Sequence, residues 1–186
     1  MKVRAATAHD AAAIAAIYAP YVLGTVVSFE TEAPDAAEMA RRMAAGGDLF
    51  PWLVACDEAG EVQGFAYACA FRPRPAYRFA VETSVYVAAG SARRGVGTSL
   101  YQALFPVLEA QGYAQAIAAI TLPNPVSVAL HERFCFRQVG AYEEVGFKQG
   151  GWHSVGLWQR ALTLAAAMPA EPKPLSALGA AWPPRP

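Results

Sequence analysis

The sequence predicts a single α/β (α+β) domain in which helices pack on one central β-sheet. Its 186 residues are enough for one domain with a sizeable core. Strand-like and helix-like segments are interspersed along the chain, and a glycine turn at 93–98 joins a strand directly to a helix. Strands mixed with helices in this way favour a layered sandwich over a bundle or a barrel.

Composition narrows the class of protein. Fifteen basic and fifteen acidic residues balance, so no positive excess favours a nucleic-acid partner. No apolar run approaches the ~18 residues of a membrane span, and no signal-peptide pattern follows Met1. Cys56, Cys69 and Cys135 lack metal-ligand spacing and are expected to be buried, reduced thiols. We therefore expect a cytoplasmic enzyme or binding domain without metal, membrane or nucleic acid.

The first third of the chain predicts a strand and two helices. Residues 2–5 form the strand, and a capping-box pattern at 7–10 precedes a helix over about 10–21 with a regular apolar face. Pro34 and Asp35 open a second helix that Gly46 and Gly47 close. The extended segment 26–31 between the helices is either one wall of a pocket or a surface connector.

The middle of the chain predicts a hairpin, a loop rich in proline and arginine, and a central strand. The hairpin pairs 52–56 with 62–70 across a polar turn. In the loop 71–77, Arg72 and Arg74 stand two residues apart between prolines, and such arginines are either solvated or bind an anionic ligand. The strand 81–87 follows and carries Glu82 among β-branched and aromatic residues.

The last third predicts two helices, three strands and a tail. A helix runs from the glycine turn to Gly112, with Pro106 as a possible kink, and 114–122 reads as a strand buried on both faces. A short helix over 126–134 carries His131. A closing strand pair, 137–142 and 154–162, flanks a linker at 145–153. From 165 to 186 the chain predicts a Pro-rich tail, extended or disordered, which Trp182 would allow to drape over the surface of the domain.

The strand, glycine turn and helix around 81–98 point to an anion site. Free backbone N–H groups and the positive end of the helix dipole meet there, and a phosphate is the usual ligand. A Walker A loop is absent from the sequence, and Gly95-Val96-Gly97 lacks the third glycine of a dinucleotide-binding fingerprint. What is left is an Arg-Arg-Gly-x-Gly-Thr turn.

This arrangement resembles the acetyl-CoA site of the GNAT superfamily, and more closely the phosphinothricin and methionine sulfoximine (sulfone) acetyltransferase family. The similarity covers nearly the whole chain to about residue 163. One departure is Cys135, which stands where a small glycine is usual. The residues that carry the resemblance are Val81-Glu82-x-Ser84-Val85-Tyr86-Val87, Arg94-Gly95-Val96-Gly97, Leu122-Pro123-Asn124, Leu130-His131-Glu132 and Lys148-x-Gly150-Gly151-Trp152-His153-x-Val155-Gly156-x-Trp158-Gln159.

The resemblance implies the GNAT fold, a mixed sheet of about seven strands with about four helices, and a homodimer. It implies direct acetyl transfer from acetyl-CoA to the amino group of a small amino acid analogue, with Glu82 as general base. His131 is implied to be a catalytic acid or base, with a packed core histidine as the alternative, and His153 shapes the pocket. The implied cofactor-binding residues are Val85, Tyr86, Val87, Arg93, Arg94, Gly95, Val96, Gly97, Thr98 and Asn124, and the implied substrate-binding residues are Arg72, Arg74, Tyr77 and Thr83.

Two other functions are open from the sequence. One is acetylation of an unrelated amine, such as an aminoglycoside, a polyamine or a protein N-terminus. The other is a catalytically silent CoA-binding module, against which the presence of both Glu82 and His131 argues.

Overall fold

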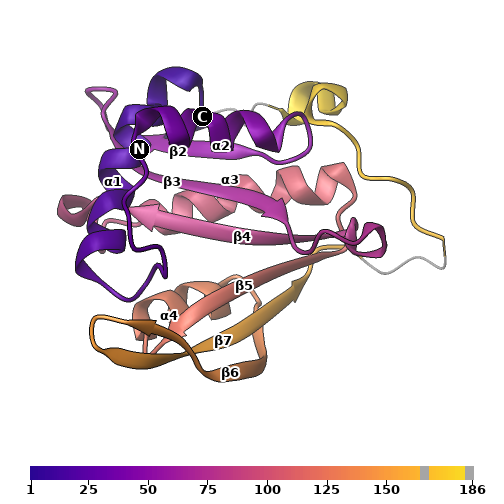
Figure 1. Ribbon diagram of the computed structural model, residues 1–186. Helices are drawn as coiled ribbons and strands as arrows, with labels where there is room; N and C mark the ends of the chain where they lie inside the picture. Colours follow the sequence, from indigo (N-terminus) through magenta and orange to yellow (C-terminus); the bar gives the residue numbers. More distant parts are fainter. Residues whose placement is uncertain (164–167, 183–186) are drawn as a thin grey trace.

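One seven-stranded mixed sheet with four α-helices makes up the domain (Figure 1). The computed structural model describes residues 1–163 and 168–182. The sheet order is β1-β2-β3-β4-β5-β7-β6, and every neighbouring pair is antiparallel except β4 and β5. The fold class expected from the sequence is therefore confirmed.

The N-terminal elements follow the predicted order. Strand β1 spans Lys2–Ala5, and a capping box between Thr7 and Asp10 precedes α1, Ala11–Gly24. Helix α1 runs three residues beyond the predicted end at 21. Helix α2, Ala36–Gly46, begins at an Asp35 cap whose side chain accepts from the Glu38 N–H, and it ends at Gly47 with positive φ.

Three antiparallel strands lead into the middle of the sheet. Strands β2, Trp52–Cys56, and β3, Val62–Ala70, form the predicted hairpin. After the Pro- and Arg-rich loop, β4, Ala80–Val87, returns beside β3. The glycine turn then begins α3, Val96–Gln111, which is continuous through Pro106.

The second half of the sheet holds the largest correction to the prediction. Strand β5, Gln115–Leu122, and helix α4, Pro125–Arg133, lie as expected. Strand β6, Arg137–Lys148, is twice the predicted length, and β7, Gly151–Ala161, begins three residues earlier than predicted. The expected linker 145–153 is paired strand around a tight turn, because Gly150 takes a positive φ of 77° that suits a two-residue hairpin loop.

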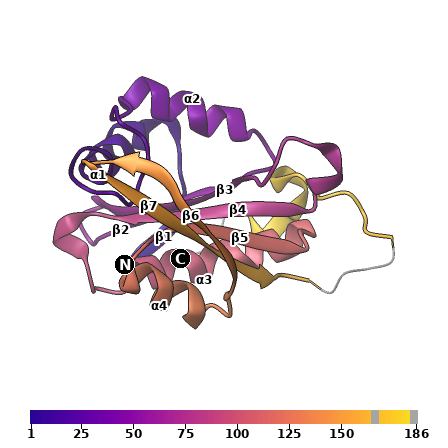
Figure 2. The ribbon, with the colours of Figure 1, turned by 60° about the horizontal axis from the view of Figure 1, so that its bottom comes forward.

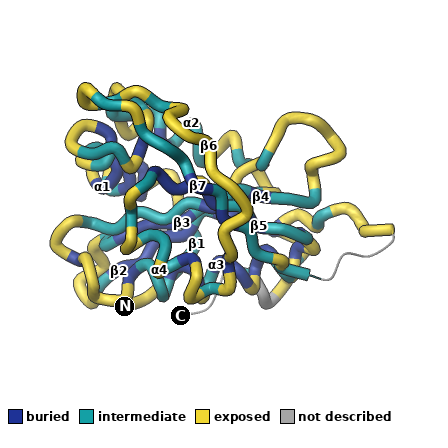
Figure 3. Tube along the Cα trace, turned by 90° about the horizontal axis from the view of Figure 1, so that it is seen from below, coloured by how far each residue is buried: buried dark blue, intermediate teal, exposed yellow. Residues whose placement is uncertain are grey.

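Two helices pack on each face of the sheet. Helices α1 and α2 lie on one face, and α3 and α4 lie on the other (Figure 2). One apolar cluster fills the space between α3 and the sheet, and a second lies between α1, α2 and strands β2 and β3. The β6 edge is exposed along most of its length (Figure 3).

Strand β5 is buried on one face only, contrary to the expectation for this strand. Ala116, Ala118 and Ile120 are buried, while Ile117 is half-buried and Ala119 is exposed. Helices α1 and α2 cover the β2–β4 side of the sheet, so the matching face of β5 has no helix above it. This uncovered face adjoins the candidate site.

The predicted burial is wrong for two of the three cysteines. Cys56 is buried in the sheet, whereas Cys69 and Cys135 are exposed and all three are free thiols. Cys69 ends β3 next to the loop, and Cys135 lies in the turn after α4, where the chain leaves the core. Apolar neighbours in sequence do not bury a residue at the end of an element.

The C-terminal segment lies against the domain where it is described. A 3-10 helix at Leu175–Ala181 contacts α3, and Leu175 is buried. The Lys173 N–H donates to Gln111 O at 2.7 Å, and the Leu175 N–H donates to Asp48 O at 2.6 Å. The predicted extended tail is thus partly helical, and Trp182 packs on the core as expected. Its portions at 164–167 and 183–186 lie outside the described residues.

Across the described ranges, no helix is long and apolar enough to span a membrane.

Candidate active site

A pocket lies where β4 and β5 diverge. Their parallel pairing covers three residue pairs and ends at Glu82 and Ile117, although both strands continue for another five residues. A cavity of about 50 Å³ opens in this gap. Of the residues singled out from the sequence, it is lined by Thr83, Val85, Tyr86, Asn124 and His131.

The backbone of β4 offers hydrogen-bonding groups to this gap. The Ala88 N–H donates to Gln63 O of the β3 side at 2.9 Å, so alternate residues Val85 and Val87 direct their N–H and C=O groups to the β5 side. The hydroxyl of Tyr21 reaches this edge and donates to Val87 O at 2.7 Å. Because β5 has moved away, the edge is suited to pair with an extended ligand.

The N-terminus of α3 adjoins the same gap. Gly95 caps the helix with φ of 80°, and Arg93 before it also has a positive φ of 61°. The first turn of a helix leaves N–H groups without intrahelical acceptors, and two exposed arginines add positive charge to them here. Gly97 fits closely, since a Cβ there would lie 3.1 Å from Leu130. This is a suitable cradle for a pyrophosphate.

Glu82 is the last residue of β4 that pairs with β5. It faces the α1 and α2 side of the sheet, opposite the core residues Val81 and Thr83. Burial raises the pKa of Glu82 above its usual range, and the charge of Arg72 opposes this shift. The carboxylate is half-buried and therefore more basic than an exposed glutamate.

His131 is held by two hydrogen bonds. Its Nδ1–H donates to Ser127 O at 2.7 Å, which leaves Nε2 unprotonated to accept from the Tyr101 hydroxyl at 2.9 Å. The ring is buried, and burial lowers the pKa of His131. The neutral imidazole thus has its one N–H engaged with the backbone. These contacts fit the packed alternative better than a proton donor.

Asn124 and Thr83 both line the pocket and also serve the fold. The Asn124 side-chain oxygen caps α4 by accepting from the Ser127 N–H at 3.1 Å. Thr83 is buried on the α3 face, and its hydroxyl lies 3.4 Å from Ile117 O. Thr83 is therefore not brought together with Arg72 and Arg74.

The predicted substrate loop lines a different cavity. Arg72, Arg74 and Tyr77 border a space of about 280 Å³ at the start of β4. The C-terminal segment forms part of its wall through Glu171, which pairs with Arg78 at 2.7 Å. Glu82 lies between this cavity and the β4–β5 pocket, within electrostatic reach of Arg72.

Several residues of the pocket were not singled out from the sequence. Val27 belongs to the segment 26–31, and its place in the pocket decides the open alternative in favour of a wall. Four of the others lie in β4 or β5, whose period-two pattern does not say where the two strands separate, and Ser127 lies on α4. The additional lining residues are Ser84, Ala119, Ile120, Thr121 and Ser127.

Comparison with known proteins assigns this chain to a family. A family model described as an acetyltransferase (GNAT) domain matches residues 3–155. The chain therefore belongs to the GNAT acetyltransferase family and is an N-acetyltransferase, so the silent-module alternative is not retained.

The chain is also similar to individual acetyltransferases whose acceptors are named. The chain is 41% identical to phosphinothricin N-acetyltransferase of Streptomyces viridochromogenes over 175 residues, 94% of this chain and 93% of the relative. It is 38% identical to the L-methionine sulfoximine/L-methionine sulfone acetyltransferase of Pseudomonas aeruginosa over 154 residues, 81% and 88% of the two chains. A solved phosphinothricin acetyltransferase from Sinorhizobium meliloti, in complex with acetyl-CoA, is similar with a TM-score of 0.87 and 40% identity over 91% and 92% of the chains.

Acetyl-CoA is the cosubstrate that the family uses, and the observed features fit it. The open β4 edge suits an extended pantetheine arm, and the N-terminus of α3 suits a pyrophosphate. No cluster of three metal-binding side chains occurs in the part of the chain that is described.

Proposed function

We propose that this N-acetyltransferase transfers the acetyl group of acetyl-CoA directly to the amino group of a small amino acid analogue. The relatives support phosphinothricin, methionine sulfoximine or methionine sulfone as this analogue. The observation that carries the proposal is the half-buried Glu82 carboxylate, with a raised pKa, at the point where β4 and β5 separate.

Glu82 is the proposed general base. An amine with a pKa of about 8 or above is mostly protonated at pH 7, so it must lose a proton before it can attack. Glu82 takes this proton directly or through a water, and the neutral nitrogen attacks the thioester carbon. The C–S bond then breaks, and the thiolate takes up the proton that the new amide nitrogen releases. Charge and atoms balance without a covalent enzyme intermediate.

The other proposed roles follow the geometry. Val85, Tyr86, Val87 and Asn124 bind the pantetheine arm, and residues 93–98 bind the pyrophosphate. Arg72, Arg74 and Tyr77 bind the anionic end of the acceptor, since guanidinium groups suit carboxylates and phosphinates. His131 supports the pocket through Ser127 and Tyr101.

Thiol release from acetyl-CoA in the presence of the three candidate amines tests this function. Substitution of Glu82 by Gln should lower kcat by ~10²–10⁴-fold, because it removes the base and keeps the shape. Glu58→Gln, at an exposed carboxylate, is the matched control and should keep full activity. Thiol release at the background rate with all three amines would exclude the proposed acceptors, and an active Glu82→Gln enzyme would exclude the base.

We also propose a homodimer that uses the β6–β7 hairpin. Strand β6 is the outer edge of the sheet and has unpaired backbone groups on one side. Large exposed apolar side chains gather on this hairpin, which favours an interface. Light scattering coupled to gel filtration should give twice the chain mass, and Trp152→Glu should shift it to the monomer. The exposed residues are Val139, Tyr142, Val145, Phe147 and Trp152.

A further inference from the structure

The turn of the β6–β7 hairpin contacts the segment that follows α1. Lys148, the last residue of β6, directs its Nζ to two backbone carbonyls, Val22 O at 2.5 Å and Ser28 O at 2.6 Å. Val22 lies in the last turn of α1, where carbonyls lack intrahelical donors and the dipole is negative. The ion pairs among the described residues do not include Lys148. Its charge is therefore committed to these carbonyls.

Two more contacts join the hairpin to this segment. The ring of Phe29 lies so close to Gly146 that a Cβ there would be 2.1 Å from it. His153 donates from Nε2 to Lys148 O at 3.0 Å, which fixes the backbone from which the lysine extends. The segment and the hairpin are thus fitted to each other at Gly146 and at Lys148.

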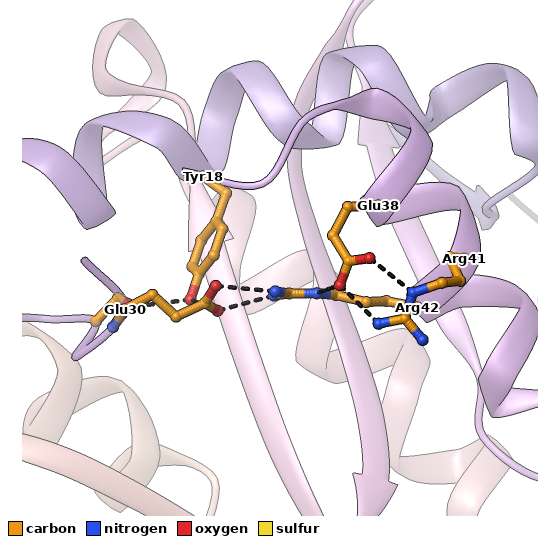
Figure 4. Close-up of polar contacts among 6 residues, drawn as sticks. Tyr18, Glu30, Glu38, Arg41 and Arg42 are labelled. Atoms are coloured by element: carbon orange, nitrogen blue, oxygen red, sulfur yellow. Dashed lines mark hydrogen bonds and ion pairs between the residues drawn. The ribbon is translucent and has the colours of Figure 1, made fainter. Parts of the chain in front are cut away.

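The opposite side of the segment is held by α1 and α2. The Tyr18 hydroxyl lies 2.7 Å from Ser28 Oγ and donates to Glu30 at 2.8 Å. Arg42 binds both oxygens of Glu30, at 2.8 and 2.9 Å (Figure 4). Val27, which lines the β4–β5 pocket, directly precedes the anchored Ser28.

We propose that Lys148 is a positioning residue for the acceptor side of the pocket. Its two hydrogen bonds hold the segment 25–30 against the hairpin, so that Val27 lines the pocket from the end of α1, on the face of the sheet toward which the proposed base Glu82 points. The proposed acetyl-CoA contacts, on the β4 edge and the N-terminus of α3, do not involve Lys148. Loss of the Lys148 ammonium should therefore weaken binding of the acceptor more than binding of acetyl-CoA. This inference rests on the proposed function, which assigns the pocket to acetyl transfer.

Steady-state kinetics of Lys148→Met, which keeps the length of the side chain, test the role. The KM for the acceptor should rise about tenfold, a typical effect of losing hydrogen bonds from a charged group, while the KM for acetyl-CoA stays within about twofold. Lys148→Arg should recover most of the acceptor affinity. Lys2→Met, at an exposed lysine of β1, is the matched control and should leave both constants unchanged.

Backbone hydrogen exchange gives a readout that does not depend on turnover. Amides of 25–30 should exchange faster in Lys148→Met than in the wild-type protein, with β4 unchanged. Gly146→Ala, which displaces Phe29, should give the same local effect and replaces the first variant if that variant does not fold. Equal rises in both KM values, or unchanged exchange at 25–30, would overturn the proposal. Absence of turnover in the wild-type enzyme would refute the proposed function alone, since the exchange result would stand.

Discussion

The hydroxyl of Tyr101 donates to Nε2 of His131 across 2.9 Å in the core between α3 and α4. Tyr101 is fully buried, and the other ring nitrogen, Nδ1, donates its hydrogen bond to Ser127 O. The imidazole is therefore held in one neutral tautomer, and protonation of Nε2 would reverse this bond, with the Tyr101 hydroxyl then accepting. His131 thus links α3 to α4 through Tyr101 while it lines the pocket.

This link predicts a pH-dependent stability. Burial lowers the pKa of His131 in the folded state, so the unfolded chain binds the proton more readily. The stabilisation that neutral His131 gives the folded state is complete above the unfolded pKa of ~6.5. It is lost as the pH falls from there through the lower pKa of the folded state. Urea unfolding at pH 7.5 and 5.5 should show a smaller pH-dependent loss of stability in His131→Asn than in the wild-type protein. An identical pH dependence would contradict the neutral assignment.

Arg72 is predicted to set the acid limb of the pH–rate profile. Its charge lowers the pKa of Glu82 against the larger effect of burial. Arg72→Met should move the acid limb of kcat/KM to higher pH, because the carboxylate loses its cationic neighbour. Arg74→Met is the control, since Arg74 is not among the groups that shift Glu82. If Arg72→Met left the acid limb unchanged, Arg72 would not control the pKa of the general base.

Gly95 is predicted to matter for acetyl-CoA binding beyond its effect on stability. A side chain at φ of 80° costs about 1–2 kcal/mol and disturbs the first turn of α3. Gly112 ends the same helix with φ of 91° and provides the matched control. Both Ala variants should lose similar free energy of unfolding, but only Gly95→Ala should weaken acetyl-CoA binding measured by calorimetry. If both variants bound acetyl-CoA equally weakly, the turn at Gly95 would have no specific role in acetyl-CoA binding.

Cys135 is predicted to be a site where substitution stabilises the protein. Its φ of 64° lies in the left-handed region, which a non-glycine residue adopts at a cost. Cys135→Gly should raise the free energy of unfolding by about 1 kcal/mol after the greater entropy of glycine in the unfolded chain is included. Cys135→Ala removes the thiol but keeps the strain, so it should not stabilise. Equal stabilisation by both variants would assign the effect to the thiol.

Local patterns predicted most of the elements. Caps and glycines gave α2 its bounds, because Asp35 and Gly47 satisfy groups within a few residues of themselves. The closing strands were predicted too short, since glycine at 146, 150 and 151 is typical of a loop as well as of a hairpin that packs against a neighbour. Only the position of Phe29 explains why Gly146 lies in a strand.

The site was predictable to the extent that it follows from one stretch of chain. The strand 81–87, the turn 93–98 and the helix behind it place backbone N–H groups and a carboxylate by local geometry. Which residues from other parts of the chain join this pocket depends on long-range packing. Val27 and Lys148 lie 121 positions apart in the chain, yet Lys148 hydrogen-bonds Ser28 O, directly after the Val27 that lines the pocket.

By itself the sequence determined the family, through its motifs, and the order of the elements, because the hydrogen bonds and caps that form them close over short distances. The site proposed for residues 82–98 was likewise predicted from one stretch of chain. The tertiary structure alone decided that Thr83 faces the core, that His131 bonds Tyr101 and that the arginine loop shares a cavity with the C-terminal segment. Burial and side-chain partners depend on which distant elements meet. Charge and acidity at the site depend on burial in turn, so the raised pKa of Glu82 follows from the packing of the whole sheet.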